Sequence, residues 1–169
     1  LRSKISTSLC EVYVATCDIA IAEYIESIGG KAIMTADTHE RASDRTAEAL
    51  LKIEETTLQN VDIVVMIQGD EPMVTPEMIS AAIKPLIEDP TINITNLMAS
   101  MNSIEEHEDP AEVKVVVDKN NFALYFSREP IPSRKKGATN IRMLKQVCII
   151  PFRRDFLLEY NQMAVSYTH

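Results

Sequence analysis

The 169-residue sequence contains no tryptophan, and aromatic residues make up only 5% of it. Proteins that bind single-stranded nucleic acids depend on aromatic rings as stacking platforms. The sequence also lacks an excess of positive charge, since its formal net charge is −8. Nucleic-acid binders neutralise phosphates with lysine and arginine. Both shortages argue against a nucleic-acid partner, but they leave room for a local basic site that binds an anionic small molecule.

Cysteine and histidine are also scarce, with three of each in widely separated positions. Cys10, Cys17 and Cys148 are odd in number and form no C-x-x-C pair. This pattern predicts reduced, buried thiols in a cytoplasmic protein rather than disulfides or a zinc site. His39 has no serine or aspartate partner at a catalytic spacing, so we interpret it as a loop residue rather than a general base.

Long hydrophobic runs are missing as well. No apolar run reaches the roughly 18 residues that a membrane-spanning helix needs, and no secretion signal is recognisable. We therefore expect no membrane partner and a cytoplasmic location. The chain begins with Leu1 rather than methionine, so the missing signal carries little weight.

The sequence that is present alternates between strand-like and helix-like segments. This alternation predicts an α/β fold with a mainly parallel sheet, helices on both faces and a small antiparallel insertion, within a single domain over residues 1–169. The helix expected at 18–28 places Ile21, Tyr24, Ile25 and Ile28 at helical spacing. The expected strands are residues 12–16, 31–35, 63–68, 94–101 and 145–152. The other expected helices are residues 43–59, 75–89 and 154–163. A hairpin is expected over residues 113–127.

A polar turn follows the apolar strand at 63–68. Its sequence is Gln68-Gly69-Asp70-Glu71-Pro72, and Thr75-Pro76 then begins a helix as N-cap and first helical residue. In open α/β sheets, ligands bind at the carboxyl ends of the strands. Asp70 could hold Mg²⁺ there, and the Gln68 amide could bind sugar hydroxyls or a carboxylate. Alternatively, Asp70 only tightens the turn.

A second polar segment, residues 38–48, enters the helix expected from Ser43 or Asp44, either of which could cap it. The N-terminus of a helix favours anions, and the planar fork of Arg45 could bind a base carbonyl or a phosphate. The alternative is an exposed i, i+3 pair between Arg45 and Glu48.

A third polar segment comes where the strand at 122–127 ends. Ser127 and Arg128 precede Pro130 and Pro132. They could line a sugar pocket, or they could simply solvate the end of the strand. Two prolines, one glycine and several basic residues predict a mobile loop over 129–140.

Several of these motifs occur together and in a fixed order: Met66–Pro72, the block His39 to Glu48, and Val113–Val116 followed by Ala123–Arg128. The set resembles the 3-deoxy-manno-octulosonate cytidylyltransferase (CMP-Kdo synthetase) family, over about residues 5–163. The resemblance implies a nucleotide-diphospho-sugar transferase fold. It also implies Mg²⁺-dependent transfer of CMP from CTP to 3-deoxy-manno-octulosonate (Kdo), with release of pyrophosphate, for lipopolysaccharide synthesis. Such enzymes are usually cytoplasmic homodimers.

The resemblance also implies roles for single residues. Asp70 is the expected Mg²⁺ ligand and catalytic residue, and Gln68 the expected contact of the sugar acid. Arg45 is expected to recognise the cytidine nucleotide or the sugar, with Ser43 nearby. Gln146 stands where the family usually has a sugar-contacting histidine, and Ile150 stands where it usually has tyrosine.

Two family elements are not found in this sequence: the glycine- and arginine-containing nucleotide loop before Leu1, and a later metal-binding aspartate. Residues 164–169 do not resemble the family and are interpreted as a non-native tail. We therefore expect residues 1–169 alone to carry half of the metal site, to be poorly stable and to turn over negligibly. Two other functions stay open: activation of another 2-keto sugar acid or use of another nucleotide, and a non-catalytic α/β module that binds sugar nucleotides.

Overall fold

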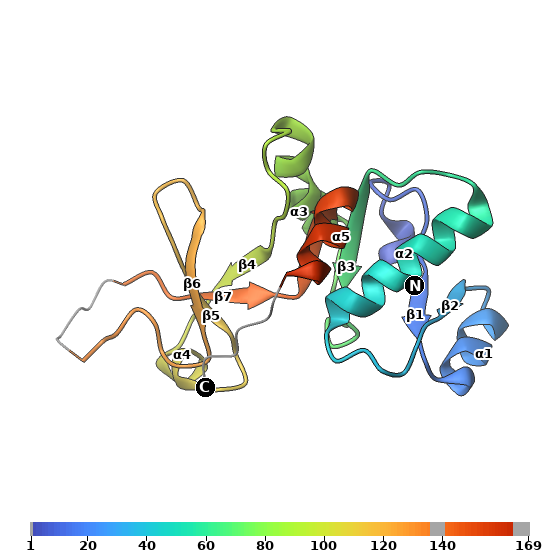
Figure 1. Cartoon of the computed structure of the whole chain (residues 1–169). Helices are drawn as coiled ribbons and strands as arrows, with labels where there is room; N and C mark the ends of the chain where they lie inside the picture. Colours follow the sequence, from blue (N-terminus) through green and yellow to red (C-terminus); the bar gives the residue numbers. More distant parts are fainter. Residues whose placement is uncertain (1, 136–140, 164–169) are drawn as a thin grey trace. The chain divides into compact units, whose positions relative to one another are not determined.

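The structure is a computed structural model that describes residues 2–135 and 141–163. The chain divides into two compact units (Figure 1). Unit 1 contains Leu1–Thr95 and Ile149–His169, and unit 2 contains Asn96–Cys148. Each unit is described by itself below. The tail at 164–169 lies outside the described residues.

Unit 1 combines two pairs of strands with helices. Strand β1 (Val14–Thr16) pairs in parallel with β2 (Ala32–Met34). Strand β3 (Ile63–Ile67) pairs antiparallel with β8 (Ile149–Arg153). The helical elements are a short 3₁₀ turn η1 (Ser3–Ile5), α1 (Ile19–Ser27), α2 (Ala42–Thr57), α3 (Pro76–Glu88) and α5 (Arg154–Gln162).

Local capping explains where α1 and α3 begin. The Asp18 carboxylate accepts hydrogen bonds from the backbone N–H groups of Ala20 and Ile21 at the start of α1. Thr75 caps α3 through the N–H of Met78, as the sequence predicts. Helix α3 continues through Pro85 to Glu88, so this proline does not end the helix.

Helix α2 begins earlier than predicted. Its N-cap position is Arg41, and the predicted caps Ser43 and Asp44 already lie inside the helix. The Asp44 carboxylate is instead bound by the Arg41 guanidinium, with N–O distances of 2.9 and 2.6 Å. The Asp44 carboxylate therefore binds Arg41 and does not cap the helix as predicted.

The core of unit 1 joins strands β3 and β8 to helices α2 and α5. Buried apolar side chains of α2, β3, β8 and α5 form one cluster: Ala47, Leu50, Met66, Ile150, Phe152 and Leu157. Helix α1 differs from the prediction, because Ile21, Tyr24 and Ile28 are 46%, 63% and 43% exposed. Only Ala22 is buried in this helix. Helical spacing therefore identified the helix correctly but not the side chains that it buries.

Unit 2 is built on a four-stranded antiparallel sheet in the order β4-β7-β5-β6. Its strands are β4 (Leu97–Ser100), β5 (Lys114–Val117), β6 (Ala123–Ser127) and β7 (Leu144–Val147), and a short helix α4 covers Ile104–Glu108. The hairpin of β5 and β6 confirms the expected antiparallel insertion. The predicted loop has no helix or strand over residues 129–135, and residues 136–140 lie outside the description.

Two expectations about the sheets are corrected. The described strands form small, mixed sheets, in which β1–β2 is the parallel pair, rather than the mainly parallel sheet expected. The strand predicted at 145–152 is interrupted at Cys148. Its first part, β7, pairs with β4 and β5, and its second part, β8, pairs with β3. The two parts have different partners, which a continuous apolar run does not reveal.

Exposure of the cysteines also differs from expectation. Cys10 and Cys17 are exposed and Cys148 is partly buried, and these three described residues form no disulfide. Burial of the first two is therefore a wrong prediction. Within the described residues, no helix is both long enough and apolar enough to cross a membrane.

Candidate functional site

The turn after β3 is held by its own backbone. The N–H of Glu71 donates to the Gln68 carbonyl at 3.2 Å, and the N–H of Val74 donates to the Glu71 carbonyl at 3.3 Å. Val74 is buried and anchors the turn, whereas Asp70 is exposed. The Asp70 carboxylate accepts no hydrogen bond from any described residue. The geometry thus gives no support to the alternative that Asp70 tightens the turn.

An exposed carboxylate without a protein partner fits a Mg²⁺ ligand. Magnesium is usually held by one or two carboxylates, together with water and substrate phosphates. Asp70 could supply one such carboxylate. No group of three or more His, Cys, Asp or Glu side chains in the described part of the chain could hold a metal ion. An ion at Asp70 would therefore depend on other oxygen ligands, such as those of a nucleotide.

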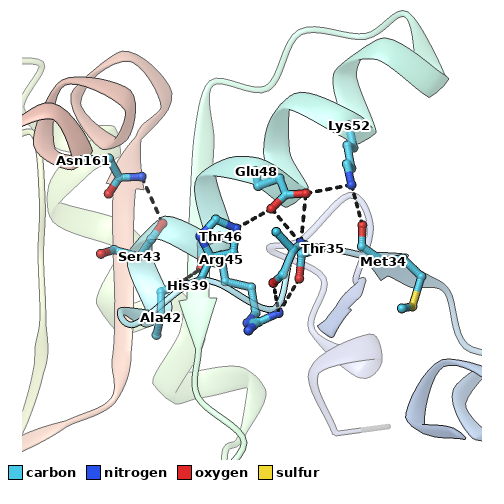
Figure 2. A network of polar contacts seen from close by, with 11 residues as sticks. Met34, Thr35, His39, Ala42, Ser43, Arg45, Thr46, Glu48, Lys52 and Asn161 are labelled. Atoms are coloured by element: carbon cyan, nitrogen blue, oxygen red, sulfur yellow. Dashed lines mark hydrogen bonds and ion pairs between the residues drawn. The ribbon is translucent and has the colours of Figure 1, made fainter. Parts of the chain in front are cut away.

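The first two turns of α2 present Arg45 beside the segment that follows β2. Arg45 Nη1 donates to Thr35 Oγ1 and, at 3.2 Å, to the Ala36 carbonyl (Figure 2). Both bonds use the same nitrogen, so Nε and Nη2 stay available to donate elsewhere. A half-buried guanidinium with two unused donor groups suits a phosphate, a carboxylate or a base carbonyl.

Glu48 does not pair with Arg45 but binds three other groups. Its carboxylate accepts the Ala36 N–H at 3.0 Å, contacts His39 Nε2, and pairs with Lys52 Nζ at 2.7 Å (Figure 2). The predicted alternative of an Arg45–Glu48 pair is therefore not the arrangement seen. Lys52, then His39 and the Ala36 N–H, lower the pKa of Glu48 to about 2, so this carboxylate is charged at neutral pH. Contact with Glu48 also gives His39 a defined structural partner.

Ser43 lies five residues before Glu48, on a different side of α2. The residue is 7% exposed, and its carbonyl accepts a hydrogen bond from Asn161 Nδ2 at 3.2 Å. Its contact with α5 is therefore structural, and a role of Ser43 in substrate binding stays a prediction.

One core supports both elements that carry the four candidate residues of unit 1: Ser43, Arg45, Gln68 and Asp70. Helix α2 and strand β3 pack together through Ala47, Leu50 and Met66. This packing fixes both the helix turn that carries Ser43 and Arg45 and the strand whose end carries Gln68 and Asp70.

The other candidate residues, Ser127, Arg128 and Gln146, lie in unit 2. Gln146 Nε2 donates to Asn96 Oδ1 at 2.7 Å, which holds one side of its amide. Ser127 Oγ accepts the Glu129 N–H at 2.9 Å. Arg128 Nη1 donates to the carbonyls of Pro110 and Ala111 at 2.9 and 3.0 Å. The bonds of Ser127 and Arg128 stabilise the end of β6, and sugar contacts by all three residues stay predictions.

Sequence reasoning missed two buried polar residues of unit 2. Lys114 is fully buried, and its Nζ donates to the carbonyls of Asp109, Glu112 and Arg128. His107 is also fully buried, with Nε2 at 3.0 Å from the Ile131 carbonyl. The sequence gives no signal for Lys114, since a lysine inside a valine-rich strand is equally typical of an exposed position.

Comparisons with known proteins add to this geometry. The profile of the family described as Cytidylyltransferase matches residues 2–167. A relative from Geotalea uraniireducens, named 3-deoxy-manno-octulosonate cytidylyltransferase, is 36% identical over 98% of this chain and 68% of its own length. A relative of the same name from Escherichia coli is 39% identical over 94% of this chain and 61% of its own length.

A solved structure is similar as well. The CMP:2-keto-3-deoxy-manno-octonic acid synthetase complexed with CTP superposes with a TM-score of 0.87 at 38% identity, over 98% of this chain and 65% of that one. The chain thus spans about two thirds of the length of the proteins it matches. From this family match and these relatives it follows that the chain belongs to the cytidylyltransferase family.

Proposed function

We propose that the protein transfers CMP from CTP to Kdo, with Mg²⁺ bound and pyrophosphate released. The observation that carries the proposal is the exposed Asp70 carboxylate, free of described partners, in the turn after β3. Support comes from the family and from the similar structure, which was solved with CTP.

In this reaction, the anomeric hydroxyl of the sugar attacks the α-phosphorus of CTP in line, and pyrophosphate leaves. No covalent intermediate with the protein is needed, so the task of the chain is to position two anionic substrates. Asp70 would hold Mg²⁺, which when bound offsets negative charge on the phosphates. The unused Nε and Nη2 donors of Arg45 would bind a phosphate, the cytosine carbonyl or the sugar carboxylate.

The sugar acid would be recognised by amide and hydroxyl groups. We assign this role to Gln68 in unit 1. In unit 2, the side chains of Gln146, Ser127 and Arg128 are separate candidates for contacts with a sugar acid. Gln146 occupies the usual position of a histidine, and its amide hydrogen-bonds but does not titrate near neutral pH. Ile150 stands where the family usually has tyrosine. An apolar residue suits this position, because Ile150 is buried in the core of unit 1.

Gln146 supports a second candidate function, activation of another 2-keto sugar acid by the same chemistry. We also propose a homodimer, a cytoplasmic location and a role in lipopolysaccharide synthesis, which rest on the family resemblance. A non-catalytic module is less well supported, since Arg45, Gln68 and Asp70 are all present.

The test is pyrophosphate release by the product of the whole reading frame that contains these residues. CTP, Kdo and Mg²⁺ are supplied together and then each is left out in turn. Release that requires all three supports the proposal. Release only with another 2-keto sugar acid changes the substrate, and CTP binding without any release favours the non-catalytic module.

A further inference from the structure

The segment Thr35–Ala36, which follows β2, is held from both sides by one helix. Arg45 binds the Ala36 carbonyl, and Glu48 binds the N–H of the same residue (Figure 2). Arg45 Nη1 also binds Thr35 Oγ1. The position of the guanidinium is therefore tied to a backbone segment whose own position depends on Glu48.

Glu48 is in turn fixed by two cationic or polar side chains. Lys52 pairs with it one turn later in α2 at 2.7 Å and reaches the Met34 carbonyl at 2.8 Å. His39 contacts it from the far end of the loop. The carboxylate thus joins the end of β2, the following loop and α2 at a single point, and its side chain is only 24% exposed.

We propose that Glu48 is a positioning residue, which sets the orientation of the Arg45 guanidinium through the Ala36 peptide. The inference rests on the proposed function, in which Arg45 contacts a substrate. Glu48 touches no substrate itself. Removing its carboxylate releases the Ala36 N–H, and the two acceptors that hold Arg45 Nη1 then shift with the loop. Such a displacement of a binding group is expected to reduce turnover strongly.

A double-mutant cycle on the product of the whole reading frame tests this. We expect E48A to lower kcat/KM by about 10- to 100-fold in the unmodified protein. In the R45A background, the same change should lower it by less than about 3-fold, because residues acting as a unit are not additive. Equal factors in both backgrounds would overturn the proposal, since a purely structural loss is independent of Arg45.

Glu54 provides a matched control on the same helix. It also accepts a backbone N–H, that of Val61 at 3.0 Å, and binds a cation, Arg154, at 2.8 Å. Any loss caused by E54A should therefore be the same with and without R45A. Coupling of E54A to R45A as strong as that of E48A would contradict a specific role for Glu48.

A second readout does not depend on turnover. The Nε–Hε NMR signal of Arg45 is assigned by its disappearance in R45A. We expect this signal to shift in E48A, which removes the acceptor of the Ala36 N–H, and to stay in place in E54A. An unchanged signal in E48A would overturn the inference. If the protein releases no pyrophosphate at all, the proposed function fails, and the NMR comparison still decides the role of Glu48.

Discussion

Arg45 and Glu48 lie one helical turn apart on α2, yet the structure gives them different partners. Their spacing is that of an exposed ion pair, which would contribute only about 0.2–0.5 kcal/mol. Instead, both side chains bind the segment that follows β2. At the scale of single residues, spacing along a helix identifies neighbours on one face. Which contacts form is decided here by a segment outside the helix, Thr35–Ala36.

Asp70 is the residue on which the proposed reaction depends most. D70N keeps the size of the side chain but removes the charge that would hold Mg²⁺. We expect it to lower Mg²⁺-dependent pyrophosphate release by the product of the whole reading frame by at least about 100-fold. D62N, which neutralises an exposed carboxylate just before β3, is the control and should change little. Unchanged kinetics in D70N would remove Asp70 from the metal site.

The lowered pKa of Glu48 predicts how acid affects stability. Lys52, His39 and the Ala36 N–H lower the pKa to about 2 from the model-peptide value of 4.5. The stability that Glu48 provides is therefore fully present above pH 4.5 and is lost as pH falls toward 2. Urea unfolding of the wild-type chain and E48Q should give a difference in unfolding free energy that shrinks over this range. A difference independent of pH would contradict the assignment.

Single elements of the fold are set by short-range signals. Thr75-Pro76 starts α3, Asp18 starts α1, and Gly29, with φ of 74°, ends α1 in the left-handed conformation. These local devices act over one helical turn, so they are readable from sequence. The start of α2 was misplaced because Arg41, which the sequence does not mark as a partner, binds Asp44.

The N-cap of α3 gives a prediction at this scale. The Thr75 hydroxyl accepts the Met78 N–H at 3.3 Å. T75A removes this acceptor and should lower the free energy of unfolding by about 1 kcal/mol, whereas T75S keeps it and should lose less than half of that. Chemical denaturation measures both. An equal loss in the two variants would mean that the hydroxyl does not contribute.

At the scale of the whole molecule, both units expose large apolar side chains. In unit 1, Tyr24 and Leu58 are 63% and 90% exposed. In unit 2, Leu124 and Tyr125 on strand β6 are 66% and 62% exposed. Strand β6 is an edge of its sheet, and exposed apolar edges favour association.

This exposure predicts the behaviour of residues 1–169 produced alone. We expect low stability and strong binding of a hydrophobic dye such as ANS. Weak dye binding by residues 1–169 would contradict this expectation.

The sequence by itself determined the four longer helices α1, α2, α3 and α5, most strands, the β5–β6 hairpin and the family, since these depend on periodicity, caps and ordered motifs. It also identified Arg45, Gln68 and Asp70 as candidates. Only the tertiary structure decided that β7 and β8 pair with different strands, that Ile21 and Tyr24 are exposed, and that Glu48 holds Ala36. Strand pairing, burial and these hydrogen bonds join residues distant in sequence, and local patterns carry no record of such partners.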